Sequence, residues 1–428
     1  MMPTPLFAMM SRPNIPSTID PVASTSTNST PRMALILVKT LARTISRTER
    51  LARSGMSLVS PSRRRCSTSA AVSPVAPEAC TVIDMIASLA IGCGCIAQHS
   101  NSAASVARGT LAAGGRKWEG KSMLDDAQLD RAAGVLLGTA AGDALGAGYE
   151  FTNPDPDLAI DMIGGGAFRW EPGEWTDDTS MAVAVALAAE PGPGIDPDAV
   201  AAGFVRWWDS RPKDIGNQTR TVLEVRPQSA ADMWARAMSL TGLTGGNGSL
   251  MRTAPVAVAY LRDADECVRM AGAIGMLTHY DEHATEACKI WTYAIRHAVL
   301  HGTFDGVREY AATSPAADYW LPRLDEAETG RPQLFPKNGW VVHALQTAWW
   351  AITNTDPSGP GQLAAALEKC VRAGGDTDTT AAIAGGLLGA RWGARAVPAQ
   401  WRKKLHGYPG LRGDDLVTLA VRIATRNA

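Results

Sequence analysis

Apolar residues recur at helical spacing along most of the chain after Met123. In the segment 124–137, Leu129, Ala133 and Leu136 fall on one face of a helix whose start is acidic. Other Ala-rich apolar runs predict helices over 181–189, 199–208, 343–353 and 381–392. Clusters of Gly, Pro and Asp separate these runs, and no β-branched strands alternate with them. We therefore predict an all-α fold, a compact multi-helix domain that occupies residues 123–428.

Residues 1–122 have a different character. Ser, Thr, Pro, Ala and Arg dominate there, few acids stand between the arginines, and apolar periodicity is weak. Such a segment buries too little surface to offset the entropy of ordering it, so we predict a disordered, low-complexity segment before the domain.

Three explanations of this N-terminal segment compete. It is a transit peptide, which would place the protein in an organelle, or a basic interaction tail. The third explanation, which we favour, is a misassigned start, with translation beginning at Met123. The most apolar stretch, 82–97, is short and contains Asp84, so we predict no membrane span.

The overall charge narrows the functional classes. The formal net charge of the 428 residues is -1, so we expect neither general nucleic-acid binding nor attraction to an acidic membrane. The 7 cysteines lack zinc-site spacing and indicate a reducing compartment. We expect a cytoplasmic monomer.

Two acidic clusters each stand directly before an apolar helix. The first is Thr176-Asp177-Asp178-Thr179, and the second runs from Asp376 to Thr380. Hydroxyls and carboxylates at helix starts are commonly caps for free N–H groups, which explains either cluster alone. Together they offer four carboxylates and several hydroxyls without His or Cys. That oxygen set suits Mg²⁺, Mn²⁺ or Ca²⁺ rather than zinc, provided that the two helix starts converge.

Glycine-rich segments suggest two further roles. The run 245–252 offers flexible backbone, free N–H groups and Arg252 for an anion. The glycines between 134 and 148 recur near every fourth residue, which favours close helix packing over a phosphate loop. Within them, Gly142-Asp143 leads on to Glu150, a candidate acid or base. His279 and His283 lack the His-Glu-x-x-His pattern, so ligand contact or packing is favoured over zinc.

Six of these segments, in order between about Leu129 and Leu405, resemble the ADP-ribosylglycohydrolases. The matching segments are 138–146, 175–179, 246–252, 278–279, 338–342 and 374–379. The resemblance implies an all-α fold with two Mg²⁺ or Mn²⁺ ions. It implies these metal ligands: Thr176, Asp177, Asp178, Asp376, Asp378 and Thr379. It implies an ADP-ribose site lined by Asn247, Gly248, Ser249, Met251 and His279. Residues 209–242 follow no motif of this family, so the resemblance does not identify the acceptor.

The implied activity is hydrolysis of the N- or O-glycosidic bond between ADP-ribose and an acceptor, either a protein side chain or a small molecule. Glu150, Asp177 and Asp178 are the candidate catalytic residues, because carboxylates can transfer protons at the anomeric carbon. Two alternatives remain open. One is a non-catalytic ADP-ribose-binding or structural, crystallin-like protein, and the other is a hydrolase of a different ADP-ribosyl compound.

Overall fold

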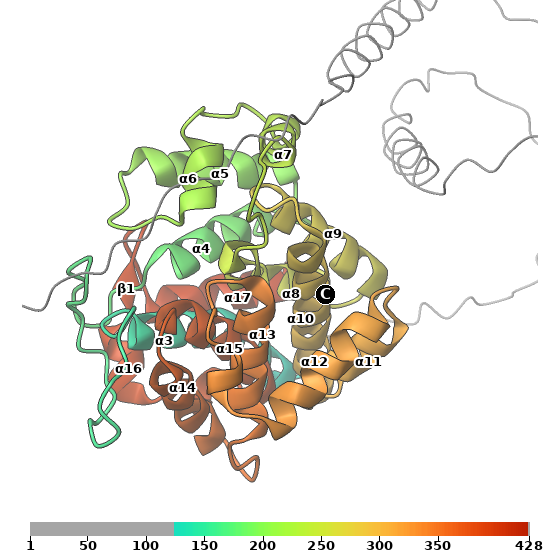
Figure 1. The fold of residues 1–428 in the computed structure, drawn as a ribbon. Helices are drawn as coiled ribbons and strands as arrows, with labels where there is room; N and C mark the ends of the chain where they lie inside the picture. The colour runs from blue at the N-terminus through green and yellow to red at the C-terminus, as the bar shows by residue number, and fades with distance from the viewer. Residues whose placement is uncertain (1–123, 427–428) are drawn as a thin grey trace, which may run out of the picture. The chain divides into compact units, whose positions relative to one another are not determined.

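The computed structural model describes residues 124–426, and the predictions made for residues 1–122 lie outside this part of the chain. Regular structure in the described part is almost entirely α-helical, which confirms the all-α prediction (Figure 1). The helices are α3 (Asp126–Gly146), α4 (Asp177–Ala189), α5 (Pro197–Asp209), α6 (Asn217–Leu223), α7 (Ala230–Met238), α8 (Ala254–Ala259), α9 (Ala264–Met276), α10 (Glu282–His301), α11 (Gly306–Thr313), α12 (Ala317–Thr329), α13 (Val341–Thr353), α14 (Gly361–Ala373), α15 (Thr377–Trp392), α16 (Ala399–Lys404) and α17 (Gly413–Arg426).

Short elements complete the described chain. Three 3₁₀ turns are η2 (Asn247–Arg252), η3 (Pro332–Leu334) and η4 (Ala394–Ala396). The strands β1 (His406–Gly407) and β2 (Leu411–Arg412) form one antiparallel pair, in which His406 is opposite Arg412. Among the described helices, none is both long and apolar enough to cross a membrane.

The first helix shows how sequence sets an element's start. Asp125 accepts a hydrogen bond from the backbone N–H of Gln128 (2.7 Å), and the Gln128 side chain accepts one from the N–H of Asp125 (3.0 Å). This reciprocal cap starts α3 at Asp126. The helix then continues to Gly146, beyond the predicted end at 137, and all residues from Ala132 onward are buried. A helix that is buried all round lies at the centre of its domain.

Helix α15 is the main partner of α3, and glycines allow their close approach. A Cβ atom on Gly134, Gly138 or Gly142 would collide with backbone carbonyl oxygens of α15. A Cβ on Gly146 would collide with the backbone nitrogen of Asp378. The four-residue glycine spacing is therefore a packing surface, as the sequence indicated. Because the two helices run antiparallel, the end of α3 lies against the start of α15.

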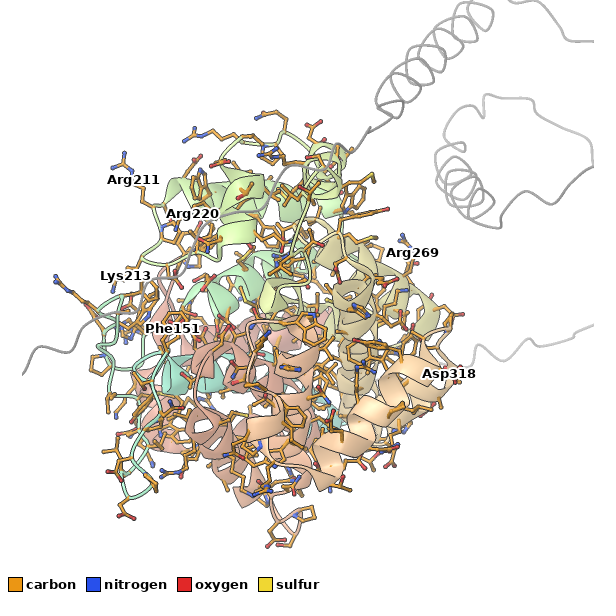
Figure 2. All side chains as sticks on the ribbon, in the orientation of Figure 1. Phe151, Arg211, Lys213, Arg220, Arg269 and Asp318 are labelled. Carbon is orange, nitrogen blue, oxygen red and sulfur yellow. The ribbon has the colours of Figure 1, made fainter. Side chains whose placement is uncertain are left out.

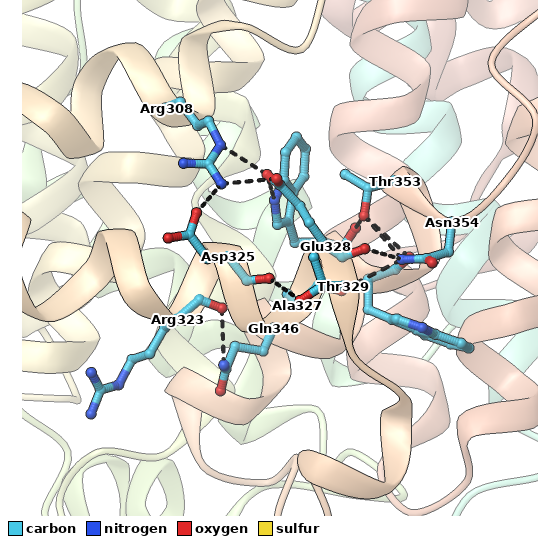
Figure 3. Close-up of polar contacts among 11 residues, drawn as sticks. Arg308, Arg323, Asp325, Ala327, Glu328, Thr329, Gln346, Thr353 and Asn354 are labelled. Carbon is cyan, nitrogen blue, oxygen red and sulfur yellow. Dashed lines mark hydrogen bonds and ion pairs between the residues drawn. The ribbon is translucent and has the colours of Figure 1, made fainter.

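Two groups of helices flank this central pair. Helices α5, α6 and α7 gather beyond α4 (Figure 1). Helices α11, α12 and α13 are held together by polar contacts (Figure 3). Arg308 on α11 donates to both carboxylate oxygens of Glu328 on α12 (2.9 and 2.8 Å), and Glu328 accepts from the indole N–H of Trp349 on α13 (2.8 Å). This network fixes α13, whose first turns border the site described next.

Candidate functional site

The start of α4 is held by a buried carboxylate from α3. Asp143 accepts hydrogen bonds from the backbone N–H of Thr176 (2.9 and 3.1 Å) and of Thr179 (2.9 Å). These are free N–H groups of the first helical turn, so Asp143 acts as a cap from another helix. Helix α4 begins at Asp177, earlier than the predicted start at 181, and this places both acids of the first cluster in its first turn. The sequence pattern did not predict this role for Asp143, which stood out there only as part of a Gly-Asp pair.

The two predicted acidic clusters converge. One carboxylate oxygen from each of Asp143, Asp178 and Asp378 lies within 4.8 Å of the others. Oδ2 of Asp178 accepts from the hydroxyls of Thr176 (3.1 Å) and Thr379 (3.4 Å), while its Oδ1 is buried without a hydrogen-bond partner. Packing of α3 against both α4 and α15 therefore brings together residues that are far apart in the sequence, since 201 positions separate Asp178 from Thr379.

A second group of three carboxylates shares one member with the first. Oxygens of Glu150, Asp376 and Asp378 also lie within 4.8 Å of one another. Oε2 of Glu150 is buried and lacks a hydrogen-bond partner. Because Asp378 belongs to both groups, it stands between two positions that could each bind a cation. A buried oxygen without a partner is costly unless a ligand or ion satisfies it.

Asparagine side chains hold Asp376 in place. Asn247 on η2 donates through Nδ2 to Oδ2 of Asp376 (2.8 Å) and to the carbonyl oxygen of Asn338 (2.9 Å). The amide oxygen of Asn338 accepts from the backbone N–H of Asp376 (3.1 Å), and its Nδ2 donates to the carbonyl of Gly374 (2.8 Å). Asp376 is the N-cap residue of α15 but makes no side-chain cap hydrogen bond. Simple capping therefore does not explain it, whereas the Thr176 hydroxyl does cap α4.

Crowding of buried carboxyl groups raises their proton affinity. Burial, followed by repulsion from Asp376 and other carboxylates, raises the pKa of Glu150 to about 9. Burial, followed by repulsion from Asp214 and Asp143, raises the pKa of Asp177 to about 8. The pKa values of Asp178 and Asp378 are raised well above the ordinary range for the same two reasons, burial first. A bound cation would reverse this effect, since it favours the ionised carboxylates.

The donor chemistry fits hard divalent cations. Each group of three consists of carboxylate oxygens, with no His or Cys ligand among the described candidates, and threonine hydroxyls contact Asp178 of the first group. Carboxylate and hydroxyl oxygens suit Mg²⁺ and Mn²⁺. Three buried oxygens lack a hydrogen-bond partner: one each from Asp178, Glu150 and the Thr179 hydroxyl. Coordination to such ions would satisfy them.

A cavity of about 520 Å³ opens onto the second group of carboxylates. The predicted residues that line it are Glu150, Asp177, Asn247, Gly248, Met251, His279, Asp376, Asp378 and Thr379. His279 is buried, and Nδ1 of its ring lies 2.7 Å from the Thr278 hydroxyl. Burial, followed by the nearby Arg252, lowers the pKa of His279 well below its ordinary value, so the ring is neutral. It precedes α10, whereas His283 lies on that helix and stacks on Tyr319.

Three predicted residues do not line this cavity: Thr176, Asp178 and Ser249. The first two lie behind it, in the buried carboxylate group. Ser249 is fully buried, close to Gly275, so the position of its side chain does not support the predicted ligand contact.

The prediction that Arg252 offers an anion contact is wrong. Its side chain is fully buried and donates to the carbonyl oxygens of Ile274 (3.2 Å) and Gly275 (3.4 Å), at the end of α9. The guanidinium also lies over the Phe204 ring, 4.7 Å from its centroid. The Arg252 guanidinium therefore anchors the end of α9, which leads to His279. A ligand in the cavity cannot reach this buried guanidinium.

The cavity also includes residues that the sequence analysis missed. Phe151 directly follows Glu150, and Phe168 lies further along the loop before α4. The segment without a recognised motif contributes Asp214, Asn217, Gln218 and Arg220, among others. Asp214 precedes α6, where a carboxylate resembles an ordinary helix-start residue. Its pKa is raised, first by burial. Nothing in the local pattern distinguishes such a residue from a cap, so only the fold reveals that it faces the cavity.

A second cavity of about 790 Å³ adjoins the first, and Gly246 and Gly339 line both. Its wall includes the 242–246 backbone, Asp281, Lys337, Trp340 and His343. The two cavities together provide room for a ligand longer than a single sugar.

Known proteins match this chain over the same region. The family model for ADP-ribosylglycohydrolase matches residues 124–428. The ADP-ribosylarginine hydrolase Tri1 of Pseudomonas putida is 33% identical over 290 residues, covering 65% of this chain and 74% of that protein. The ADP-ribosyl-[dinitrogen reductase] glycohydrolase of Rhodospirillum rubrum is 30% identical over 291 residues, covering 64% and 90% respectively.

A solved structure agrees with the sequence matches. The structure described as an ADP-ribosylglycohydrolase-related protein complex superposes with a TM-score of 0.58 and 28% sequence identity. The match covers 71% of this chain and 100% of that chain. The helices, the convergent acidic clusters and these matches lead to one conclusion: the chain belongs to the ADP-ribosylglycohydrolase family and is a hydrolase that releases ADP-ribose from acceptor groups.

Proposed function

We propose that the protein hydrolyses the N-glycosidic bond between ADP-ribose and an arginine side chain, with two Mg²⁺ or Mn²⁺ ions at the two carboxylate groups. The observation that carries the metal proposal is the position of Asp378, which is shared by both groups beside buried, unpartnered oxygens of Asp178 and Glu150. Helix caps alone would not require two convergent sets of acids.

The residues that would hold the ions are Thr176, Asp177, Asp178, Asp376, Asp378 and Thr379, with Asp143 and Glu150 added from the geometry. Bound divalent ions supply positive charge that neutralises the carboxylates and orients the ribose hydroxyls. Asp178 lies behind the cavity, so we assign it to metal binding alone and withdraw its predicted catalytic role.

Carboxyl side chains that face the cavity would transfer protons in the reaction. A water oxygen bonds to C1″ of the ribose, and the bond from C1″ to the guanidine nitrogen breaks through an oxocarbenium-like state. The water gives up a proton, and the departing nitrogen gains one. Glu150 is our first candidate for this transfer, because its carboxyl group lines the cavity and keeps a second oxygen when one oxygen binds an ion. Asp177 and Asp214 line the same cavity and are the next candidates.

The substrate would occupy both cavities. Its ribose end would lie at the carboxylate groups, with Asn247, Gly248, Met251 and His279 around it. The nucleotide end would extend past Gly246 and Gly339 into the second cavity, beside Trp340. We keep Ser249 only as a support for this loop, because its side chain is buried.

Two observations support arginine as the acceptor. Relatives from Pseudomonas putida and Serratia proteamaculans, 33% and 30% identical, are named ADP-ribosylarginine hydrolases. The lining of the first cavity contains five carboxyl groups and one guanidinium, that of Arg220. Even with four carboxylates engaged by metals, Asp214 would remain to attract a cationic acceptor.

The test is to incubate the purified protein with peptides ADP-ribosylated on arginine or on serine, with Mg²⁺, with Mn²⁺ or with EDTA. We expect release of free ADP-ribose from the arginine peptide with metal and none with EDTA. Release from the serine peptide alone would overturn the acceptor assignment. Binding of ADP-ribose without any release would support the non-catalytic alternative. Metal titration by calorimetry gives the number of ions per chain.

We further propose that the protein acts as a cytoplasmic monomer on ADP-ribosylated proteins, and that residues 123–428 form the working domain. The cysteines in the described chain are free and buried, which agrees with a reducing compartment. Sedimentation analysis of the full chain and of a 123–428 fragment tests the monomer and the domain. A fragment that aggregates or loses activity would contradict the proposed boundary, and cell fractionation tests the compartment.

A further inference from the structure

Phe151 combines strain with exposure beside the cavity. Its φ is 60°, in the left-handed region that bulky residues rarely adopt. Its side chain is 66% exposed, yet it contributes to the cavity lining. Four non-glycine residues of the described chain have such a backbone, and the others are Arg169, Arg211 and Arg226. An exposed phenyl ring gains little from burial, so core packing does not explain why a strained position carries it.

Backbone hydrogen bonds hold the segment that carries this ring. The N–H of Phe151 donates to the carbonyl oxygen of Gly375 (2.7 Å), and the N–H of Gly375 donates to the carbonyl of Thr152 (3.3 Å). Gly375 directly precedes Asp376, and Glu150 directly precedes Phe151. The backbone of Phe151 is therefore held beside Glu150 and Asp376, two members of one carboxylate group, where the proposed function places the scissile bond.

The neighbouring cavity shows which part of the substrate Phe151 would meet. The nucleotide end has room beyond Gly246 and Gly339, in a cavity that Phe151 does not line. The group that remains near Phe151 is then the acceptor. Figure 2 shows Phe151 on the same side of the molecule as Arg211, Lys213 and Arg220, away from Asp318, and Arg220 lines the same cavity.

The lining of the first cavity suits a planar cation. An aromatic face attracts a guanidinium stacked on it, and the lining holds five carboxyl groups, Asp214 among them, against one cation, Arg220. Arg211 and Lys213 do not line this cavity. We propose that Phe151 is a specificity-determining residue, which stacks on the guanidinium plane of the acceptor arginine. This inference rests on the proposed arginine acceptor and adds the residue that recognises it.

The test compares Phe151→Ala, Phe151→Tyr and wild type on an ADP-ribosylarginine peptide, with product affinity measured in parallel. Stacking that is equal in the ground and transition states predicts a KM raised roughly threefold to thirtyfold in F151A, with kcat within about twofold. Tyr should restore the KM. Affinity for free ADP-ribose should stay within about twofold, because the product lacks the acceptor.

Two more variants separate recognition from folding. Phe151→Gly relieves the left-handed strain, so its Tm should equal or exceed that of wild type while its KM rises as in F151A. Leu158→Ala is the matched control, since Leu158 is an exposed apolar residue of the same segment that does not line the cavity. It should leave KM unchanged.

The outcomes are distinguishable. If wild type does not release ADP-ribose from the arginine peptide, the proposed function fails and this inference falls with it. If wild type is active but F151A keeps the wild-type KM, the inference alone is overturned. The inference is also overturned if affinity for ADP-ribose falls in parallel with KM, because Phe151 would then act on the shared part of the substrate.

Discussion

The hydroxyl of Thr377 donates a hydrogen bond to the carbonyl oxygen of Gly146, with 2.9 Å between the two oxygens. These are the first residue of α15 and the last residue of α3. The bond satisfies a carbonyl at the end of one helix with a side chain from the start of another. It holds in register the two helix ends that carry Asp143 and Asp378, so the packing of the core sets the geometry of the candidate metal site.

Alanine at Gly138 or Gly142 should separate this helix pair. Each new methyl group would collide with a carbonyl oxygen of α15, and backbone cannot move aside as a flexible side chain can. We expect a loss of about 1–3 kcal/mol in the free energy of unfolding and a lower affinity for Mg²⁺. Denaturant titration and calorimetry measure the two effects. Gly361→Ala is the control, because nothing lies within 4 Å of its added Cβ. Unchanged stability in both G138A and G142A would refute the packing account.

Replacing Asp178 or Asp378 by Asn should reduce metal binding without unfolding the protein. Asn keeps the shape but removes a negative charge, so we expect metal affinity and hydrolysis to fall together, by about tenfold or more. In EDTA, Tm should hold or rise, since the crowded carboxyl groups repel one another. Asp196→Asn is the matched control, because Asp196 is an exposed N-cap that accepts from the N–H of Asp198 (2.9 Å). Full activity of either site variant at sub-millimolar Mg²⁺ would remove that residue from the site.

The metal-free protein should lose stability as pH rises. The folded-state pKa values of Glu150 and Asp177, about 9 and about 8, exceed the ordinary values of 4.5 and 3.8. Between the ordinary and the folded-state pKa values, the folded state binds more protons than the unfolded state. The contribution of these two carboxyl groups to the free energy of unfolding is therefore complete below about pH 4 and is lost as pH rises through the folded pKa values. For these groups, Tm in EDTA should therefore fall between about pH 5 and pH 9. Added Mg²⁺ should raise Tm more at pH 8 than at pH 5.5, because it binds the ionised carboxylates. A stabilisation by Mg²⁺ that is independent of pH would contradict this linkage.

Arg252→Lys should weaken ADP-ribose binding through the position of His279. Lysine keeps the charge but loses the planar group that reaches the carbonyls of Ile274 and Gly275 together. We expect a destabilisation of roughly 1.5–3 kcal/mol and a weaker affinity for ADP-ribose in calorimetry. Arg269→Lys is the control: it is an exposed change on α9, the helix that carries Ile274 and Gly275, and should alter neither stability nor affinity. Destabilisation with intact ADP-ribose affinity would show that Arg252 supports the fold without positioning the ligand site.

The sequence by itself determined the helical character of the described chain and most candidate ligands. Periodicity and caps are local properties, so the runs around Met181, Ala199, His343 and Ala381 could be identified directly as helices, although their starts differed by a few residues. The two acidic clusters were visible because each stands next to such a run. The glycine spacing after Gly134 correctly indicated close packing, but it did not name the partner helix.

Only the tertiary structure decided which of these residues meet. The convergence of Asp178 and Asp378 depends on α3 packing against two helices distant in sequence, which no local pattern encodes. Arg252 and Ser249 stand in a glycine-rich run that resembles a ligand loop, but both side chains are buried. The local sequence could not reveal this, because burial depends on the whole fold. Asp214 and Phe151 were missed for the converse reason: a carboxylate before a helix and a phenylalanine in a turn acquire meaning only when folding turns them toward the same cavity.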